Sequence, residues 1–200
     1  MNRIQCLMGG VVLAGLIGGA IEADAHDAAT TPVGGYTSVR LDGSFLTALT
    51  SLGVTPGAVG AARVYEYKGG TYAAFPVTTG SVDLAKTLAE INHTGGLSLV
   101  AGSTTVELLD FSIEVAPKGS VLTGVVTADG VFVGRIPLFD LSLGNAGISS
   151  ANKFLDITNV GVKLDPKAAE ALSGVFHATI PVLPVGTAEV RSVLADETGL

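Results

Sequence analysis

The sequence is poor in several residue types on which common functional sites depend. Its 200 residues include one cysteine, two methionines and no tryptophan. A single cysteine excludes an intrachain disulfide framework and a cysteine-based zinc site. Charged residues make up 14% of the chain, and 11 basic against 18 acidic residues give a formal net charge of -7. An acidic chain with so few lysines and arginines does not suit nucleic acid or an anionic membrane surface.

The local motifs of common enzymes are also missing. The sequence has no G-x-S-x-G nucleophile elbow, no H-E-x-x-H zinc motif and no phosphate-binding glycine loop before an expected helix. Its histidines, His26, His93 and His177, lie far apart in the sequence, which does not suit a local metal site. We therefore expect a protein that is not an enzyme and that holds no metal ion directly.

The first 25 residues have the layout of a secretory signal peptide. Arg3 gives a basic start, Ile4–Ile21 is an apolar, glycine-rich run, and Ala23–Ala25 forms an Ala-x-Ala cleavage site. A single membrane anchor is the alternative, although a run of this length barely spans a bilayer. Cleavage would leave His26 as the new N-terminus and remove every cysteine and methionine. We expect export to the periplasm, the cell envelope or the medium, with no transmembrane anchor after cleavage.

The mature chain is expected to form one domain. Residues 26–35 are small and polar with proline and glycine, which favours a flexible leader. Residues 36–195 then form the predicted domain, and 196–200 form a tail.

Strand patterns dominate this domain. The stretch Leu109–Val115 alternates apolar and polar residues, and Val106 and Leu108 precede it on the opposite phase. That phase shift predicts a β-bulge near Leu108–Leu109. Asp129-Gly130 between two apolar runs predicts a hairpin turn. Short strands at this spacing favour an all-β fold, specifically a two-sheet antiparallel β-sandwich of immunoglobulin-like type.

Two segments are predicted to be short helices. Ser44–Leu52 has apolar residues at helical spacing and is followed by Gly53. The second helix, over Asp165–Val175, begins with an N-cap aspartate followed by Pro166 at the first helical position. Gly174 is expected to end it.

Tyrosines and histidines are the candidate ligand-binding residues. Tyr65, Tyr67 and Tyr72 surround a Lys-Gly-Gly hairpin turn, where aromatic packing across the hairpin is the simplest interpretation. A phenol is also a known ligand of ferric haem iron. His93 precedes two glycines, so it is either a turn residue or a residue that points into a ligand pocket. His177 is the other imidazole of the expected domain. Thiolate and thioether ligands are absent from the mature chain.

From residue 75 to about 190 the order of motifs resembles the HtaA family of secreted or surface haem-binding domains of actinobacteria, and uncharacterised secreted bacterial proteins related to it. The stretches that carry the resemblance are Phe75–Val82, Ile91–Leu99, Val106–Phe111, Leu122–Val126, Val162–Asp165 and Ala168–Leu172, with Gly43–Phe45 upstream.

The resemblance implies a β-sandwich with short helices that binds haem. In the family, a tyrosinate in the first helical stretch ligates the iron, and a histidine of an H-x-G-G-like segment hydrogen-bonds that phenol. His93 matches the histidine, but Ser44–Ala48, which matches the first stretch, contains no tyrosine.

The expected function is therefore an exported β-sandwich binding module. Its expected ligand is haem or another flat hydrophobic molecule, and its expected partners include a haem-carrying protein. The alternative is a structural or protein-interaction domain of the cell envelope without a small-molecule ligand.

Overall fold

The computed structural model describes residues 29–195, which contain twelve strands and two helices. The predicted signal peptide, the first three residues of the predicted leader and the tail at 196–200 lie outside the described residues. None of the helices in the described part is long and apolar enough to cross a membrane.

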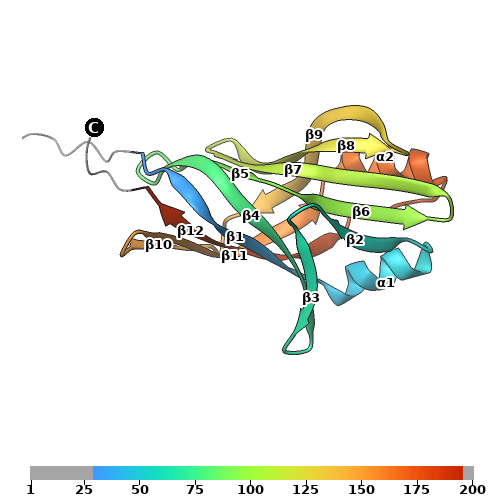
Figure 1. Cartoon of the computed structure of the whole chain (residues 1–200), viewed down its shortest axis with the longest axis horizontal. Helices are drawn as coiled ribbons and strands as arrows, with labels where there is room; N and C mark the ends of the chain where they lie inside the picture. Colours follow the sequence, from blue (N-terminus) through green and yellow to red (C-terminus); the bar gives the residue numbers. More distant parts are fainter. Residues whose placement is uncertain (1–28, 196–200) are drawn as a thin grey trace, which may run out of the picture.

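All twelve strands belong to one antiparallel sheet, and eight of them close into a barrel (Figure 1). The barrel strands run in the order β8-β7-β5-β4-β1-β12-β11-β9, and the pairing of β9 with β8 completes the ring. The eight barrel strands are β1 (Pro32–Leu41), β4 (Gly70–Asp83), β5 (Leu88–His93), β7 (Thr104–Ala116), β8 (Gly119–Ala128), β9 (Val131–Ser142), β11 (Phe154–Leu164) and β12 (Pro184–Leu194).

Four shorter strands extend the sheet beyond this ring. They are β2 (Thr55–Val59), β3 (Arg63–Tyr67), β6 (Gly96–Ala101) and β10 (Gly147–Ala151). β6 pairs with β7 and β2 pairs with β6, while β3 pairs with β4 and β10 pairs with β11. In Figure 1 the hairpin of β3 and β4 projects away from the body of the molecule.

The all-β class with two helices is confirmed, but the chain forms one continuous closed sheet rather than two stacked sheets. The cause is that the long strands change neighbours along their length. The first half of β7 pairs with β6 and its second half pairs with β5, while β8 pairs with both halves. The sheet therefore continues around the barrel, and closure removes the free edges that two separate sheets would expose.

Positive backbone φ angles mark the tight turns and the bulge. Asp129 and Gly130 have φ of 50° and 78°, the type I′ geometry expected for an Asp-Gly hairpin. The predicted bulge is present, but it lies at Asp110, with φ of 48° and a register shift between Leu109 and Ser112. It restores the inward phase, so Leu108 before it and Phe111 after it are both buried. Ser112, which the alternation placed on the wet face, is buried as well.

Both predicted helices form. The first, α1 (Gly43–Ser51), begins after Asp42, whose side chain accepts a hydrogen bond from Ser44 N. The second, α2 (Pro166–Phe176), begins after Asp165, whose carboxylate accepts from Lys167 N at 2.7 Å. It continues past Gly174 and ends at His177, which has a left-handed conformation. Both helices lie at one end of the barrel in Figure 1, where α2 packs against β9 and α1 against β12 and β2.

The sheet begins earlier than the sequence indicated. Thr30 forms a bridge with Val82, and β1 starts at Pro32, so residues 30–35 of the expected leader pair with other strands. Strand β1 lies between β4 and β12. Its residues therefore alternate between the barrel interior and the outer surface, which places two different environments on one strand.

Candidate functional site

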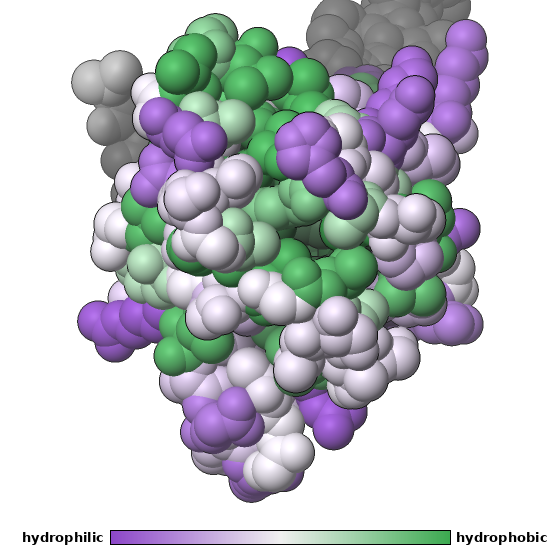
Figure 2. Space-filling model, turned by 90° about the vertical axis from the view of Figure 1, so that its right-hand side faces the viewer, coloured by the Kyte–Doolittle hydropathy of each residue, from purple (hydrophilic) through white to green (hydrophobic). Residues whose placement is uncertain are grey.

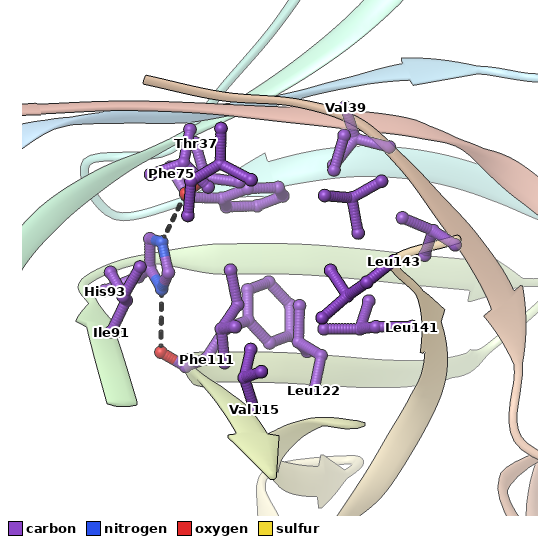
Figure 3. A pocket seen from close by; sticks show the side chains of 16 residues that line it. Thr37, Val39, Phe75, Ile91, His93, Phe111, Val115, Leu122, Leu141 and Leu143 are labelled. Atoms are coloured by element: carbon purple, nitrogen blue, oxygen red, sulfur yellow. Dashed lines mark hydrogen bonds between the residues drawn. The ribbon is translucent and has the colours of Figure 1, made fainter. Parts of the chain in front are cut away.

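His93 is a buried residue at the end of β5, and it faces the barrel interior (Figure 3). Only 5% of its surface is exposed. Its Nε2 lies 2.6 Å from Thr37 Oγ1 on β1, and its Nδ1 lies 3.0 Å from the carbonyl oxygen of Phe111 on β7. The carbonyl can only accept, so Nδ1–H donates to Phe111 and the Thr37 hydroxyl donates to Nε2. The imidazole thereby links three barrel strands.

The surroundings of His93 keep its ring neutral. Burial lowers its pKa from 6.5 to about 4, and the hydrogen bond to the Phe111 carbonyl opposes that shift only partly. Burial disfavours the charged imidazolium, because the barrel interior cannot replace the hydration that the ring loses. At neutral pH, His93 is a neutral group with both nitrogens in use.

The cavity beside His93 is too small for a cofactor. Its volume is about 40 Å³, and 16 residues line it. Among these described residues, Thr37 and His93 are the polar ones, and the others are apolar. Sites for drug-sized ligands occupy about 300–1,000 Å³. His93 does border a cavity, as one sequence interpretation required, but the space as packed does not fit haem.

The three predicted tyrosines lie on the β3–β4 hairpin. The rings of Tyr65 and Tyr72 stack at 5.6 Å between centroids, and Tyr67 meets Tyr72 edge-on at 6.1 Å. Tyr65 and Tyr67 are exposed. The turn between the strands contains Lys68 and Gly69, both with positive φ. The simple interpretation, aromatic packing across a hairpin, describes this geometry.

The predicted site residues lie in three places: the three tyrosines on the β3–β4 hairpin, His93 inside the barrel and His177 at the end of α2. Strand β1 separates the first two places. Tyr36 and Thr37 are neighbours on β1, and strand geometry sends their side chains to opposite faces. Thr37 holds His93 inside the barrel, whereas Tyr36 and Tyr65 line a groove on the outer surface. His177 is exposed at the end of α2.

The outer groove has a volume of about 940 Å³. It lies between β3 and the outer faces of β1, β12 and β11. Its lining residues are Gly35, Tyr36, Ser38, Ala58, Arg63, Val64, Tyr65, Ala74, Phe154, Glu189, Arg191 and Val193. These residues come from strands that are adjacent in space and far apart in the sequence.

Cross-strand pairing places an aromatic ring and a guanidinium group side by side in the outer groove. Tyr36 lies opposite Arg191, and Arg191 lies opposite Asp156. The Arg191 guanidinium lies 5.1 Å from the centre of the Phe154 ring, and its Nε is 3.7 Å from Asp156 Oδ1. Arg63 adds a second cation. Such a surface can stack against a flat ring and bind carboxylates at its edge.

The sequence indicated only part of the outer groove. Tyr65 was a candidate, but Tyr36, Arg191 and Phe154 were not. Tyr36 on β1 and Arg191 on β12 occupy alternate positions that signal an outward face, and Phe154 is the first residue of β11, but only the strand order shows that these residues meet. Over residues 29–195, no group of three or more His, Cys, Asp or Glu side chains is arranged to hold a metal ion.

Comparison with known proteins finds likeness in structure only. No family model matches the chain, and no curated protein matches it. The C-terminal domain of HtaA from Corynebacterium glutamicum superposes with a TM-score of 0.60 at 14% identity, covering 83% of this chain and 99% of that domain. The chain has an HtaA-type fold.

Two further structures from the same organism agree with this HtaA-type fold. The heme binding protein HtaB has a TM-score of 0.51 at 10% identity, and the match covers 84% of this chain and 96% of the HtaB chain. The N-terminal domain of HtaA has a TM-score of 0.51 at 14% identity, and the match covers 82% of this chain and 99% of that domain. The predicted resemblance is therefore confirmed at the level of the fold.

Proposed function

We propose that this HtaA-like chain is an exported binding module that takes haem, or a similar flat carboxylate, in the outer groove. The proposal depends on one observation above all. The groove, at about 940 Å³, is of ligand size, whereas the cavity beside His93, at about 40 Å³, is not.

The chemistry of the outer groove suits the parts of a haem molecule. Tyr36, Tyr65 and Phe154 offer ring faces and edges for a flat macrocycle. Arg63 and Arg191 can form charge-assisted hydrogen bonds with two propionate carboxylates. The phenols of Tyr36 and Tyr65 are the groups here that can ligate ferric iron. Binding of haem is also what the name of the structural neighbour HtaB states for that protein.

His93 has a structural role in this proposal. Its two nitrogens are engaged by Thr37 and Phe111, and it faces away from the groove. It aligns β5, β1 and β7, and β1 carries Tyr36 on its other face. We propose binding rather than catalysis, and the Ala-x-Ala pattern at Ala23–Ala25 supports the proposed export.

A hemin titration of the mature protein tests the proposal. We expect a Soret band that saturates at one equivalent, and loss of the phenolate-type spectrum in the double variant Tyr36→Phe/Tyr65→Phe. Tyr67→Phe is the matched control, because Tyr67 is a tyrosine of the same hairpin that lies outside the groove lining. Absence of a Soret band, or the same spectrum in all three proteins, would contradict the proposal.

A second candidate is a protein-interaction domain of the cell envelope. The observation in its favour is the β8–β9 hairpin tip, where Val131, Phe132 and Val133 are 67%, 67% and 58% exposed. Three consecutive exposed apolar residues are typical of contact surfaces. A protein that fails to bind hemin, and whose retention by envelope fractions depends on Phe132, would favour this candidate.

A further inference from the structure

The outer strand of the β3–β4 hairpin has a free edge. β3 pairs with β4 along its whole length, and within residues 29–195 no strand pairs with its other side. The hairpin stands away from the body of the molecule in Figure 1, and all five residues of β3 are exposed. The unpaired N–H and C=O groups of such an edge can bind another extended chain.

One face of this hairpin carries aromatic rings and a cation. Arg63, Tyr65 and Tyr67 alternate along β3, so their side chains share the face, and Tyr72 of β4 lies opposite Tyr65. The contacts that Tyr72 makes with Tyr65 and Tyr67 hold the three rings in place. Tyrosine and arginine are the residues enriched at the positions that dominate protein interfaces. A tyrosine that is already ordered also loses little freedom when a partner binds.

Two further cations reach the same face. Lys68 Nζ lies 5.2 Å from the centre of the Tyr67 ring. Arg40 extends from β1 across β4 where Gly70 has no side chain, because a methyl group at Gly70 would lie only 3.0 Å from Arg40 Nε. In the described part of the chain, no carboxylate forms an ion pair with Arg40, Arg63 or Lys68. These three cations, on a chain with a formal net charge of -7, are available to an anionic partner.

The other face of the hairpin has a different character. Val64 and Glu66 alternate with the residues above, so they lie on this second face. The Glu66 carboxylate accepts a hydrogen bond from Thr71 Oγ1 at 2.5 Å. A strand added beside β3 would send its side chains alternately to the two faces. Acidic side chains suit the face with the cations, and uncharged side chains suit the face with Glu66.

These features favour a polypeptide partner over the other occupants. Antiparallel pairing with β3 of a second copy, centred on Tyr65, would bring Arg63 of one copy beside Lys68 of the other, and like charges destabilise a pair of strands. Figure 2 shows the hairpin as the lower tip of the molecule, where hydrophilic and intermediate residues replace the hydrophobic ones of the body. The tip is therefore not an apolar patch. An anionic glycan can use the rings and cations, but only a polypeptide also uses the free edge.

We propose that β3 binds an extended acidic segment of a partner protein as an additional strand. The backbone of the segment hydrogen-bonds to the free edge, and acidic side chains at every second position bind Arg40, Arg63 and Lys68. A third strand also stabilises a hairpin that stands apart from the body. Binding requires no rearrangement of the protein. Arg63 and Tyr65 also line the outer groove, but this site does not depend on haem binding there.

Synthetic peptides added to the whole mature chain test the charge requirement. The probe is a fluorescent peptide of alternating threonine and glutamate, and its control has glutamine in place of glutamate. Fluorescence anisotropy should show saturable binding of the glutamate peptide at one equivalent, weakened by added salt. The glutamine peptide should bind at least about tenfold more weakly, because the charge-assisted hydrogen bonds are lost. No saturable binding, or equal binding of the two peptides, would overturn the proposal.

Methylation of the peptide backbone tests the use of the edge. In an added strand, alternate N–H groups point toward β3 and the others point toward solvent. Two glutamate peptides, one N-methylated at every glutamate and one at every threonine, should therefore differ. One set of methyl groups should abolish binding, and the other should leave it nearly unchanged. Equal effects of the two sets would show that the peptide does not add as a strand and would overturn the proposal.

Substitutions that spare the outer groove locate the site. Arg40→Gln/Lys68→Gln should weaken binding of the glutamate peptide about tenfold and leave hemin binding unchanged. Lys118→Gln/Lys167→Gln is the matched control, because it removes two charges away from the hairpin and should keep the affinity. Thermal unfolding shows first that both variants fold.

Two results with these variants would overturn the proposal. Equal weakening in both double variants would show general attraction to the charge of the protein rather than a site on β3. Polygalacturonate, an anionic glycan, is titrated in parallel. If it binds more tightly than the peptide and loses affinity in Arg40→Gln/Lys68→Gln, the face belongs to a glycan. Hemin binding that persists when peptide binding is absent leaves the proposed haem site standing, so the two proposals fail separately.

Discussion

The two faces of β1 differ in what they can accept. The inner face, with Thr37 and Val39, belongs to a packed interior in which the buried polar atoms of the described residues all have hydrogen-bond partners. The outer face, with Tyr36 and Ser38, belongs to a groove of ligand size with two arginines nearby. One strand thus separates a site that stabilises the fold from the groove in which we propose that a flat acid binds. The resemblance to haem-binding domains pointed toward His93, but the accessible chemistry lies on the opposite face.

The largest expected difference between the faces concerns stability. Phe111 is 2% exposed and meets Phe75 edge-on at 4.9 Å between centroids. Phe111→Ala should cost about 3–5 kcal/mol, because it removes a buried ring and leaves a cavity. Phe132→Ala, at a position that is 67% exposed, should stay within about 0.5 kcal/mol. Denaturant unfolding measures both values, and similar losses would show that the barrel interior is misassigned.

The interior should also make stability depend on pH through His93. Its pKa is about 4 in the folded chain, against 6.5 when unperturbed. Between these values the unfolded chain binds a proton that the folded chain does not, so stability is full above about pH 6.5 and falls as the pH drops. The loss should approach about 3 kcal/mol near pH 4.

Unfolding of His93→Gln across this range provides the comparison, because the variant has no imidazole to titrate and its curve should be flatter. If His93→Gln and wild type lose stability in parallel from pH 6.5 to 4, His93 is not a buried neutral group.

Substitutions at two adjacent residues of β1 should differ in their effect on stability, because the two side chains lie on opposite faces of the strand. Thr37→Val removes the hydroxyl that donates to His93 Nε2 and leaves a buried nitrogen without a partner. The expected cost is about 1–3 kcal/mol. Ser38→Ala, one residue away on the outer face, should change stability by less than about 0.5 kcal/mol. Denaturant midpoints at pH 7 distinguish them, and equal effects would show that the alternation along β1 is wrong.

Much of the fold was accessible from the sequence because its signals are local. Asp129-Gly130 predicts a turn through backbone conformation, and Asp165-Pro166 predicts a helix start through capping. The closed sheet was not accessible, because it depends on which strands pair, and β7 pairs with three different partners along its length. The sequence predicted the bulge at Leu108–Leu109, whereas it lies at Asp110. The positive φ that marks the bulge is taken there by an aspartate, and no glycine in the sequence indicated the position.

The candidate site was less predictable than the fold for the same reason. The sequence left His93 as either a turn residue or a residue that points into a ligand pocket. It lies buried beside a small cavity, and its burial and its Thr37 partner depend on the approach of β1. Tyr36 and Arg191 belong to the two ends of the sequence, and only the pairing of β1 with β12 makes them neighbours. A pattern read along one strand cannot show what the next strand contributes.

At Arg191 a small predicted effect on stability is accompanied by a clear predicted effect on hemin binding. Arg191 is exposed, and its contact with Asp156, at 3.7 Å, is a surface ion pair. Arg191→Ala should therefore change the free energy of unfolding by less than about 1 kcal/mol. If the guanidinium binds a propionate, the same change should weaken hemin binding about tenfold. Unfolding and hemin titration on one sample measure both, and unchanged affinity would remove Arg191 from the site.

The most direct test of the central claim is a hemin titration of two variants that differ at neighbouring positions, Tyr36→Phe and Thr37→Val. The hydroxyls lost belong to opposite faces of β1. We predict that Tyr36→Phe alters the Soret spectrum or weakens hemin binding, while Thr37→Val binds hemin as the wild type does. The titration is run under conditions in which unfolding measurements show that Thr37→Val is folded. Binding that is lost in Thr37→Val and kept in Tyr36→Phe would place haem inside the barrel beside His93 and contradict this account.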